Sequence, residues 1–239
     1  MSGHSKWAGI KHHKAAQDAK RSNSFTKLSN DITIAARRGG GDIGFNPSLR
    51  SAVEKAKGAN MPKDKIEKAV KRGTGELGGP AVEELLLEAF GAGNVGILVA
   101  ALSDNRNRTI PDIKNLLNKH GGRFAEGGGV AYQFTQKGVI RLEVSSQAAP
   151  QFEELVIEAE AEDYTLEDGF AVVYCPVAEV HTLRAQLEAA GFKVESAELE
   201  QVPNSAVEVG DEELEKVAHL VEILEEYDDV TAVYTTIKE

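Results

Sequence analysis

The chain has 239 residues, of which 41% are hydrophobic, which is enough for two or three folded domains and excludes a disordered chain. A single cysteine excludes a disulfide framework and favours a reducing compartment. The longest apolar run, residues 95–102, is too short to cross a bilayer, and the first residues contain no apolar signal core. We therefore expect a cytoplasmic protein with no membrane partner.

Charge is distributed very unevenly along the chain. Residues 1–72 contain 16 Lys and Arg but 6 Asp and Glu, a net charge of +10, whereas the remainder has a net charge of −21. This asymmetry is typical of a basic segment that contacts a polyanion beside an acidic body that avoids it.

The first part of the chain is predicted to be helical, because apolar residues recur there at helical spacing, as in Phe25, Leu28, Ile32 and Ala35. Four helices are expected: residues 6–20, a helix from an N-cap at Ser24 to the glycines at 39–41, one opened by Asn46 and Pro47, and one opened by Pro62 and ended by Gly73. Residues 73–80 have the composition of a linker.

Strands and helices are mixed after this linker. We predict strands at 82–90, 96–102 and 130–134, with a helix at 109–119 between the last two. A β-α-β-β-α-β pattern follows, with strands at 139–144, 164–166, 170–175 and 192–199, and this order is the ferredoxin-like arrangement. A helix around Leu214 to Leu224 and a strand at 230–237 end the chain.

The predicted fold class is α+β with three domains. Residues 1–76 form a basic N-terminal helical bundle, residues 77–136 and 204–239 form an α+β domain, and residues 137–203 form a ferredoxin-like α+β domain inserted in the second. The insertion is preferred because the last helix and strand complete the middle domain, which otherwise lacks a second helix. The alternative is two consecutive domains with a docked tail.

Lysines, an aromatic residue and two imidazoles lie together near the start of the chain. Lysines provide phosphate contacts and aromatic rings provide a stacking surface, so this pattern favours nucleic-acid binding. The candidate nucleic-acid-binding residues are Lys6, Trp7, Lys11, His12, His13, Lys14, Lys20, Arg21, Lys27, Arg37 and Arg38. The alternative is a solvated face of a helical bundle with Trp7 in its core.

A second group of residues lies between the predicted strand at 96–102 and the helix that follows. Two arginines at a helix start could hold a phosphate or an RNA backbone, and the group is Asn105, Arg106, Asn107, Arg108 and Thr109. The equally weighted alternative is a turn capped by Thr109, in which the arginines pair with local acids.

The remaining candidates for chemistry point away from an enzyme. His4, His12 and His13 lack supporting cysteines, so no metal is expected. Cys175 lies in an apolar strand, and Gly127 to Gly129 lack the spacing of a phosphate-binding motif and read as a turn between strands. Neither catalytic residues nor a cofactor are predicted.

Several long motifs closely resemble the YebC/PmpR family over nearly the whole chain. They are Gly3-His4-Ser5-Lys6-Trp7, Asn46-Pro47-Ser48-Leu49-Arg50, Asn60-Met61-Pro62-Lys63-Asp64 and Asp104-Asn105-Arg106-Asn107-Arg108-Thr109. The chain departs from the family pattern at His13, where Lys or Arg is usual, and at Ile43 and Ala92, where Pro is common. The resemblance implies the same three domains, and a role as a transcriptional regulator that binds DNA or as a translational activator.

Three hypotheses follow from these observations. The first is a DNA-binding transcriptional regulator, whose basic helical domain neutralises phosphates. The second is a ribosome-associated translation factor, whose basic face binds ribosomal RNA. The third is a protein-interaction scaffold that works through the ferredoxin-like domain. The sequence leaves the oligomeric state open, and a monomer is compatible with each hypothesis.

Overall fold

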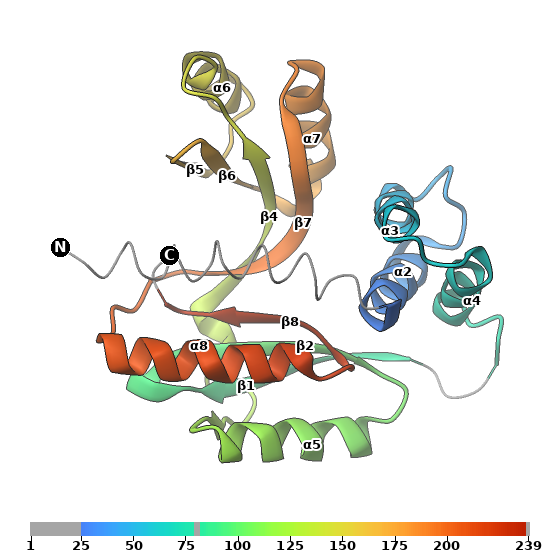
Figure 1. The fold of residues 1–239 in the computed structure, drawn as a ribbon, viewed down its shortest axis with the longest axis vertical. Helices are drawn as coiled ribbons and strands as arrows, with labels where there is room; N and C mark the ends of the chain where they lie inside the picture. The colour runs from blue at the N-terminus through green and yellow to red at the C-terminus, as the bar shows by residue number, and fades with distance from the viewer. Residues whose placement is uncertain (1–24, 79–81, 238–239) are drawn as a thin grey trace. The chain divides into compact units, whose positions relative to one another are not determined.

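The structure, a computed structural model, describes residues 25–78 and 82–237. The fold is mixed α+β, with two four-stranded antiparallel sheets (Figure 1). The chain divides into two compact units. Unit 1 comprises residues up to Gln133 and from Ser205 onward, and unit 2 is Phe134–Asn204.

Three helices of unit 1 form the helical bundle: α2 (Phe25–Gly39), α3 (Pro47–Gly58) and α4 (Lys63–Thr74). Their apolar stripes meet in a core that includes Leu28, Ile32, Leu49, Val53 and Ile66. The predicted cap of α3 is confirmed, because the side chain of Asn46 accepts a hydrogen bond from the Leu49 amide at 3.0 Å and Pro47 begins the helix.

The end of α4 differs from the prediction. Gly73 lies inside the helix, and the C-cap is Gly75, whose φ of 79° suits glycine. The linker predicted to begin at residue 73 therefore begins two residues later. Gly73 is instead a site of close approach, because a Cβ there would lie 2.4 Å from the carbonyl oxygen of Thr33 on α2. The helix predicted at residues 6–20 and the Ser24 cap lie outside the described residues.

The first sheet belongs to unit 1 and has the strand order β3-β1-β2-β8. Its strands are β1 (Glu83–Phe90), β2 (Gly96–Ser103), β3 (Arg123–Phe124) and β8 (Val230–Thr235). The short helix η1 (Ala92–Asn94) connects β1 to β2, and the longer helices are α5 (Arg106–Lys119) and α8 (Asp211–Glu226). The last strand of the chain belongs to this sheet, since β8 pairs with β2.

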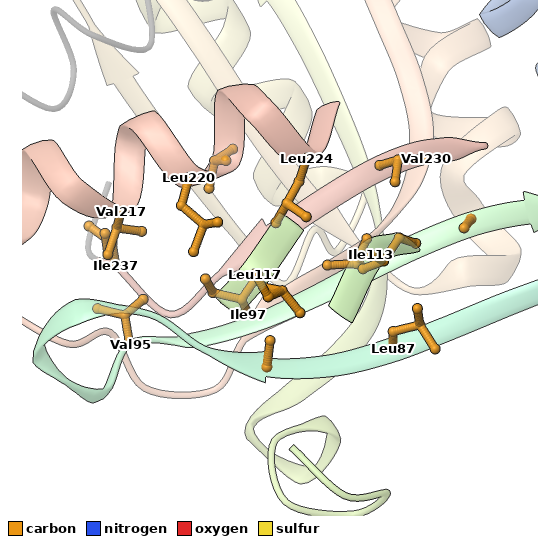
Figure 2. Packing of buried hydrophobic residues seen from close by; sticks show 14 of the residues in the cluster. Leu87, Val95, Ile97, Ile113, Leu117, Val217, Leu220, Leu224, Val230 and Ile237 are labelled. Atoms are coloured by element: carbon orange, nitrogen blue, oxygen red, sulfur yellow. The ribbon is translucent and has the colours of Figure 1, made fainter. Parts of the chain in front are cut away.

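The core of this sheet contains residues of its strands and of the two helices α5 and α8, and Figure 2 shows Leu117 and Leu220 of those helices beside Ile97. Ile97 and Val99 of β2 pack there with Leu117 of α5 and Leu220 of α8. Side chains alternate across a strand, so Leu98 and its even-numbered neighbours point to the opposite face. Leu98 is also buried, and this confirms the prediction that the apolar run is a central strand covered on both faces.

Unit 2 contains its own sheet, with the strand order β5-β6-β4-β7. In chain order its elements are β4 (Phe134–Glu143), α6 (Ala149–Glu158), β5 (Asp163–Glu167), β6 (Phe170–Cys175), η3 (Val177–Glu179), α7 (Val180–Ala189) and β7 (Lys193–Pro203). The predicted β-α-β-β-α-β order is observed. Asp168 and Gly169, with φ of 50° and 85°, turn β5 into β6.

The strand predicted at residues 130–134 is wrong. Residues Ala131–Gln133 form the short helix η2, and β4 begins at Phe134, five residues before the strand predicted at 139–144. The physical reason is the carboxylate of Glu88, which binds backbone N–H groups of this segment that a strand would need for its own pairing.

Candidate nucleic-acid interface

The predicted basic interface falls partly within the described structure. Lys6, Trp7, Lys11, His12, His13, Lys14, Lys20 and Arg21 lie outside the described residues, and their role stays a prediction. Lys27, Arg37 and Arg38 are described, and all three lie on α2.

Lys27 lies where α2 meets the end of α8. Its ammonium donates a hydrogen bond to the carbonyl oxygen of Glu225, and Nδ2 of Asn30 donates to the carbonyl oxygen of Asp228 at 3.1 Å. The C-terminal carbonyls of a helix carry partial negative charge, which a lysine neutralises well. The half-buried Lys27 therefore serves this junction rather than an open surface.

Arg38 also contacts the first sheet. Its guanidinium pairs with both carboxylate oxygens of Glu84, and Arg72 of α4 lies 3.7 Å from the carboxylate of Asp104. Exposed ion pairs contribute little stability, about 0–1 kcal/mol each. These two pairs lie where the helical bundle meets the sheet, and they neutralise two of the cations of the bundle.

A second set of cations on the bundle has no such partner. Among residues 25–78 and 82–237, no ion pair or hydrogen bond engages the side chains of Arg37, Lys57, Lys68 and Lys71. Arg37 and Lys71 are in the last turns of α2 and α4. These turns are adjacent, because a Cβ on Gly73 would lie 3.1 Å from the backbone nitrogen of Arg37.

The bundle keeps a positive charge after its internal pairs are counted. Residues 25–76 contain 11 Lys and Arg and 6 Asp and Glu, a net charge of +5. Cations at helix C-termini are favourable for the helices themselves, so part of this pattern serves folding. Within this sum, Arg38 and Arg72 pair with Glu84 and Asp104 of the sheet, whereas Arg37, Lys57, Lys68 and Lys71 are exposed.

The loop between α2 and α3, residues 40–46, carries an aromatic residue that the sequence analysis did not single out. Phe45 is 89% exposed, and Ile43 beside it is 41% exposed. The sequence signal that could have identified Phe45 is a phenylalanine in a glycine-rich loop between two helices that carry basic residues. Its full exposure depends on the loop conformation, which local sequence does not reveal.

The second predicted group, Asn105 to Thr109, lies at the start of α5. Arg108 donates to Asp229 at 2.7 Å and lies 3.7 Å from Asp104, and Arg106 lies 3.9 Å from Glu83. The hydrogen bond and the negative charge of Asp229 raise the pKa of Arg108. Both arginines thus face carboxylates, as in the alternative in which they pair with local acids. Asn105 and Asn107 are exposed.

Thr109 is not the helix cap that this alternative assumed. Helix α5 begins at Arg106, and Asn105 occupies the cap position without a side-chain capping bond. The Thr109 hydroxyl is buried and lies 2.6 Å from both Ser103 Oγ and Asp229 Oδ2. Its role is to tie α5 to the end of β2 and to the residue that precedes β8.

The triple glycine belongs to a loop that surrounds a buried carboxylate. Glu88 of β1 accepts hydrogen bonds from the backbone amides of Gly128 at 2.6 Å, Ala131 at 2.8 Å and Val130. Burial acts to raise the pKa of Glu88, but these three amides together outweigh it and lower the pKa. The carboxylate is ionised and fixes the loop that leads to β4.

The single thiol is poorly suited to nucleophilic chemistry. Cys175 is buried, and burial together with the negative charges of Glu162 and Glu179 raises its pKa to about 11. Within the described part of the chain, no group of three or more His, Cys, Asp or Glu side chains could hold a metal ion. None of the helices described there is long and apolar enough to cross a membrane.

Comparison with known proteins identifies the family. Residues 5–76 match the TACO1/YebC protein N-terminal domain, and residues 82–237 match the TACO1/YebC second and third domain. The chain belongs to the TACO1/YebC family. The resemblance seen in the sequence motifs is therefore confirmed.

Relatives of this TACO1/YebC protein match it over nearly its whole length. A Persephonella marina protein named a probable transcriptional regulatory protein is 46% identical over 98% of this chain and 95% of its own length. A protein of the same name from Thermotoga maritima is also 46% identical, over 98% and 93% of the two chains. The crystal structure of a conserved hypothetical protein from Aquifex aeolicus is similar with a TM-score of 0.82, at 38% identity over 92% of this chain and 91% of that one.

Proposed function

We propose that this chain is a non-enzymatic regulator of gene expression that binds nucleic acid through its helical bundle, with DNA as the first candidate target. The observation that carries the proposal is that the described residues offer no partner to Arg37 and Lys71, at the adjoining ends of α2 and α4 on a bundle of net charge +5. Lys6, Lys11, Lys14, Lys20 and Arg21, which the sequence predicts to bind nucleic acid, add further positive charge to the N-terminal part of the chain.

The charge of the remaining chain supports a confined interface. The residues after 72 have a net charge of −21, so a polyanion is repelled from them and guided to the bundle. Relatives that match over the full length are named probable transcriptional regulatory proteins, and that name favours DNA.

A ribosome-associated translation factor is the second candidate. The exposed ring of Phe45 favours it, because folded RNA offers unpaired bases on which an aromatic side chain can stack, whereas a DNA duplex keeps its bases stacked on one another. The same cations would then contact the ribosomal RNA backbone.

We also propose that the three-domain division expected from the sequence applies, with the ferredoxin-like domain inserted in the second. The antiparallel sheet order β5-β6-β4-β7 in unit 2 supports this, since its hairpin strands β5 and β6 lie on one side of β4 and the last strand lies on the other. Flanking segments of unit 1 on both sides of Phe134–Asn204 support an insertion.

Salt dependence of binding tests whether the bundle is the interface. If about six phosphates are contacted, affinity for labelled duplex DNA should fall ~10³-fold between 50 and 200 mM salt. Arg37→Glu should weaken binding and reduce the slope of log affinity against log salt by about 1. Lys119→Glu is the matched control, because Lys119 also lies in the last turn of a helix but on the acidic body. Equal losses for the two variants would contradict an interface on the bundle.

Crosslinking in living cells, followed by sequencing of the bound nucleic acid, separates the two candidates. Promoter DNA recovered with the wild type and lost with Arg37→Glu/Lys71→Glu would support the transcriptional role. Ribosomal RNA recovered and lost in the same way would support the translational role.

A further inference from the structure

The α2–α3 loop presents one aromatic ring almost entirely to solvent. Phe45 is the most exposed large hydrophobic side chain in the described part of the chain, at 89%, whereas Phe25 at the start of α2 is 36% exposed and lies under the ammonium of Lys65. Isolated apolar side chains on a surface are common. Phe45 differs in that its loop is built to hold it outward.

The side chains of Asn46 and Asp42 fix the conformation of this loop together with backbone hydrogen bonds. Asn46 is buried, and its Nδ2 donates to the carbonyl oxygens of Ala35 and Gly40, both at 2.8 Å. Asp42 accepts from the amide of Gly44 at 2.7 Å, and its carbonyl oxygen accepts from the amides of Phe45 and Asn46. A loop backbone held in this way is pre-organised, so little backbone entropy is lost when Phe45 is covered.

Positive charge lies beside the loop that carries the ring. Arg50 donates from Nε to the carbonyl oxygen of Ile43 at 3.2 Å and from Nη2 to that of Gly44 at 2.9 Å, which places its exposed guanidinium against the loop. The last turn of α2, which contains Arg37, leads into the same loop. This turn packs against Asn46, because a Cβ added to Gly39 would lie 2.6 Å from the Asn46 side chain. Asp42 supplies the one carboxylate of residues 40–46.

We infer that Phe45 stacks on an unpaired base of a single-stranded nucleic-acid segment, while Arg50 and Arg37 contact the adjoining phosphates. This combination of an exposed ring and neighbouring cations is how proteins bind single strands without reading sequence, since every base has a face to stack on and every nucleotide has a phosphate. The inference rests on the proposed function, because it assigns the kind of nucleic acid that the bundle binds.

A protein partner fits the same surface less well. The apolar area consists of Phe45 and the less exposed Ile43, and it is surrounded by charged and glycine residues, whereas a stable protein interface buries about 800 Å² on each partner. Two apolar side chains beside guanidinium groups suit a base and its phosphate.

The test compares full-length wild type with Phe45→Ala and Phe45→Trp by fluorescence anisotropy, at one low salt concentration. The probes are labelled oligo(dT), oligo(U) and a DNA duplex, each about 20 nucleotides long, which exceeds the roughly 4–16 nucleotides that one binding fold covers. Tyr132→Ala is the matched control, since Tyr132 is 72% exposed and lies outside the bundle. Unchanged melting temperatures would show that the variants fold.

We expect Phe45→Ala to weaken single-strand binding about 5- to 150-fold, the effect of losing one stacked base, and Phe45→Trp to bind at least as tightly as the wild type. Duplex affinity should stay within about twofold, and so should the affinities of Tyr132→Ala. A larger loss on oligo(U) than on oligo(dT) would identify RNA as the ligand, and the reverse would identify single-stranded DNA.

Two results would overturn the inference while leaving the proposed function standing. One is a wild type that binds these probes and a Phe45→Ala variant that binds them equally well. The other is an equal loss on duplex and single strands, which would mean that Phe45 does not contact a base. A wild type that binds none of the probes would instead refute the proposed function itself, and reduced self-association of Phe45→Ala without loss of binding would assign the ring to a protein contact.

Discussion

Replacing Glu88 by glutamine should release the loop that joins the first sheet to unit 2. Glutamine keeps the size of the side chain but has one acceptor oxygen in place of two. That oxygen can still accept from Val130 and Ala131, which share one carboxylate oxygen, but the amide NH2 then faces the N–H of Gly128. One bond is lost and two bonds to a charged group become bonds to a neutral one.

The cost can be worked from these three bonds. A hydrogen bond to a charged group contributes about 1.5–3 kcal/mol and a neutral one about 0.5–1.5 kcal/mol, so each weakened bond costs about 1 kcal/mol. Gly128 is exposed, so its amide can turn to water, and losing its bond costs about 1 kcal/mol more. The total is about 3 kcal/mol, or roughly a 150-fold increase in the open population of the loop.

Hydrogen exchange followed by mass spectrometry measures this opening directly, because protection of the amides at Val130 and Ala131 reports the free energy of local unfolding. Glu83→Gln is the control, since Glu83 lies on the same strand but is exposed and is 3.9 Å from Arg106. Its effect should stay within about 0.5 kcal/mol. Protection in Glu88→Gln within about threefold of the wild type would show that the bonds to the carboxylate do not hold the loop.

The pH dependence gives this prediction a sign. The folded pKa of Glu88 is lowered, so its contribution is fully present above the unfolded value of about 4.3 and is lost as the pH falls through the lower folded value. After correction for intrinsic exchange rates, the difference between wild type and Glu88→Gln should be constant near neutral pH and should shrink below about pH 4. A difference that persists unchanged in strong acid would contradict the assignment.

Three further predictions concern packing and titration. Gly73→Ala should destabilise the bundle by about 1–3 kcal/mol, because its Cβ would overlap a carbonyl of α2, whereas Gly58→Ala, which meets nothing within 4 Å, should stabilise it by up to about 1 kcal/mol; urea unfolding of both variants measures the contrast. Burial and the hydrogen bond from its hydroxyl to Asp112 raise the pKa of Tyr227 to about 12, so this group favours folding below pH ~10 and loses that effect as the pH rises through 12. Tyr227→Phe should therefore remove a tyrosinate that appears near pH 12 in an absorbance titration, and loss of one that appears near pH 10 instead would contradict the assignment. Cys175 should react with a disulfide reagent only after unfolding, because its thiol is buried and its pKa is about 11; rapid reaction of the native protein at pH 8 would argue against this burial.

The sequence predicted correctly those helices and strands that are specified by their own residues. The Asn46-Pro47 pair specifies a helix start through its own side chain and ring, and the apolar run of β2 specifies a strand covered on both faces. The strand predicted at residues 130–134 failed because Glu88, more than forty residues earlier, captures the amides of Val130 and Ala131. A contact between residues so far apart in sequence cannot be predicted from the residues around 130–134 alone.

The candidate site was predictable to a similar extent. Composition placed the basic surface on the helical part of the chain, but the number of free cations depends on distant carboxylates and carbonyls. Lys27 and Arg38 are engaged by Glu225 and Glu84, whereas Arg37, next to Arg38 in sequence, is not. Neighbouring arginines on a helix point in different directions. Only the folded structure therefore shows that, among the described residues, Arg38 is paired and Arg37 is not.

The position of β8 beside β2 has a consequence for how the protein is made. The hydroxyl of Thr231 bonds to the carbonyl oxygen of Ala100 across 131 residues of sequence, an interval that a ribosome needs roughly 7 to 26 seconds to translate. During that time β2 emerges with one hydrogen-bonding edge unpaired, while unit 2, built from consecutive residues, can complete its own sheet. A chain released before residue 230 would keep that apolar edge open and could recruit another nascent chain in place of its own last strand.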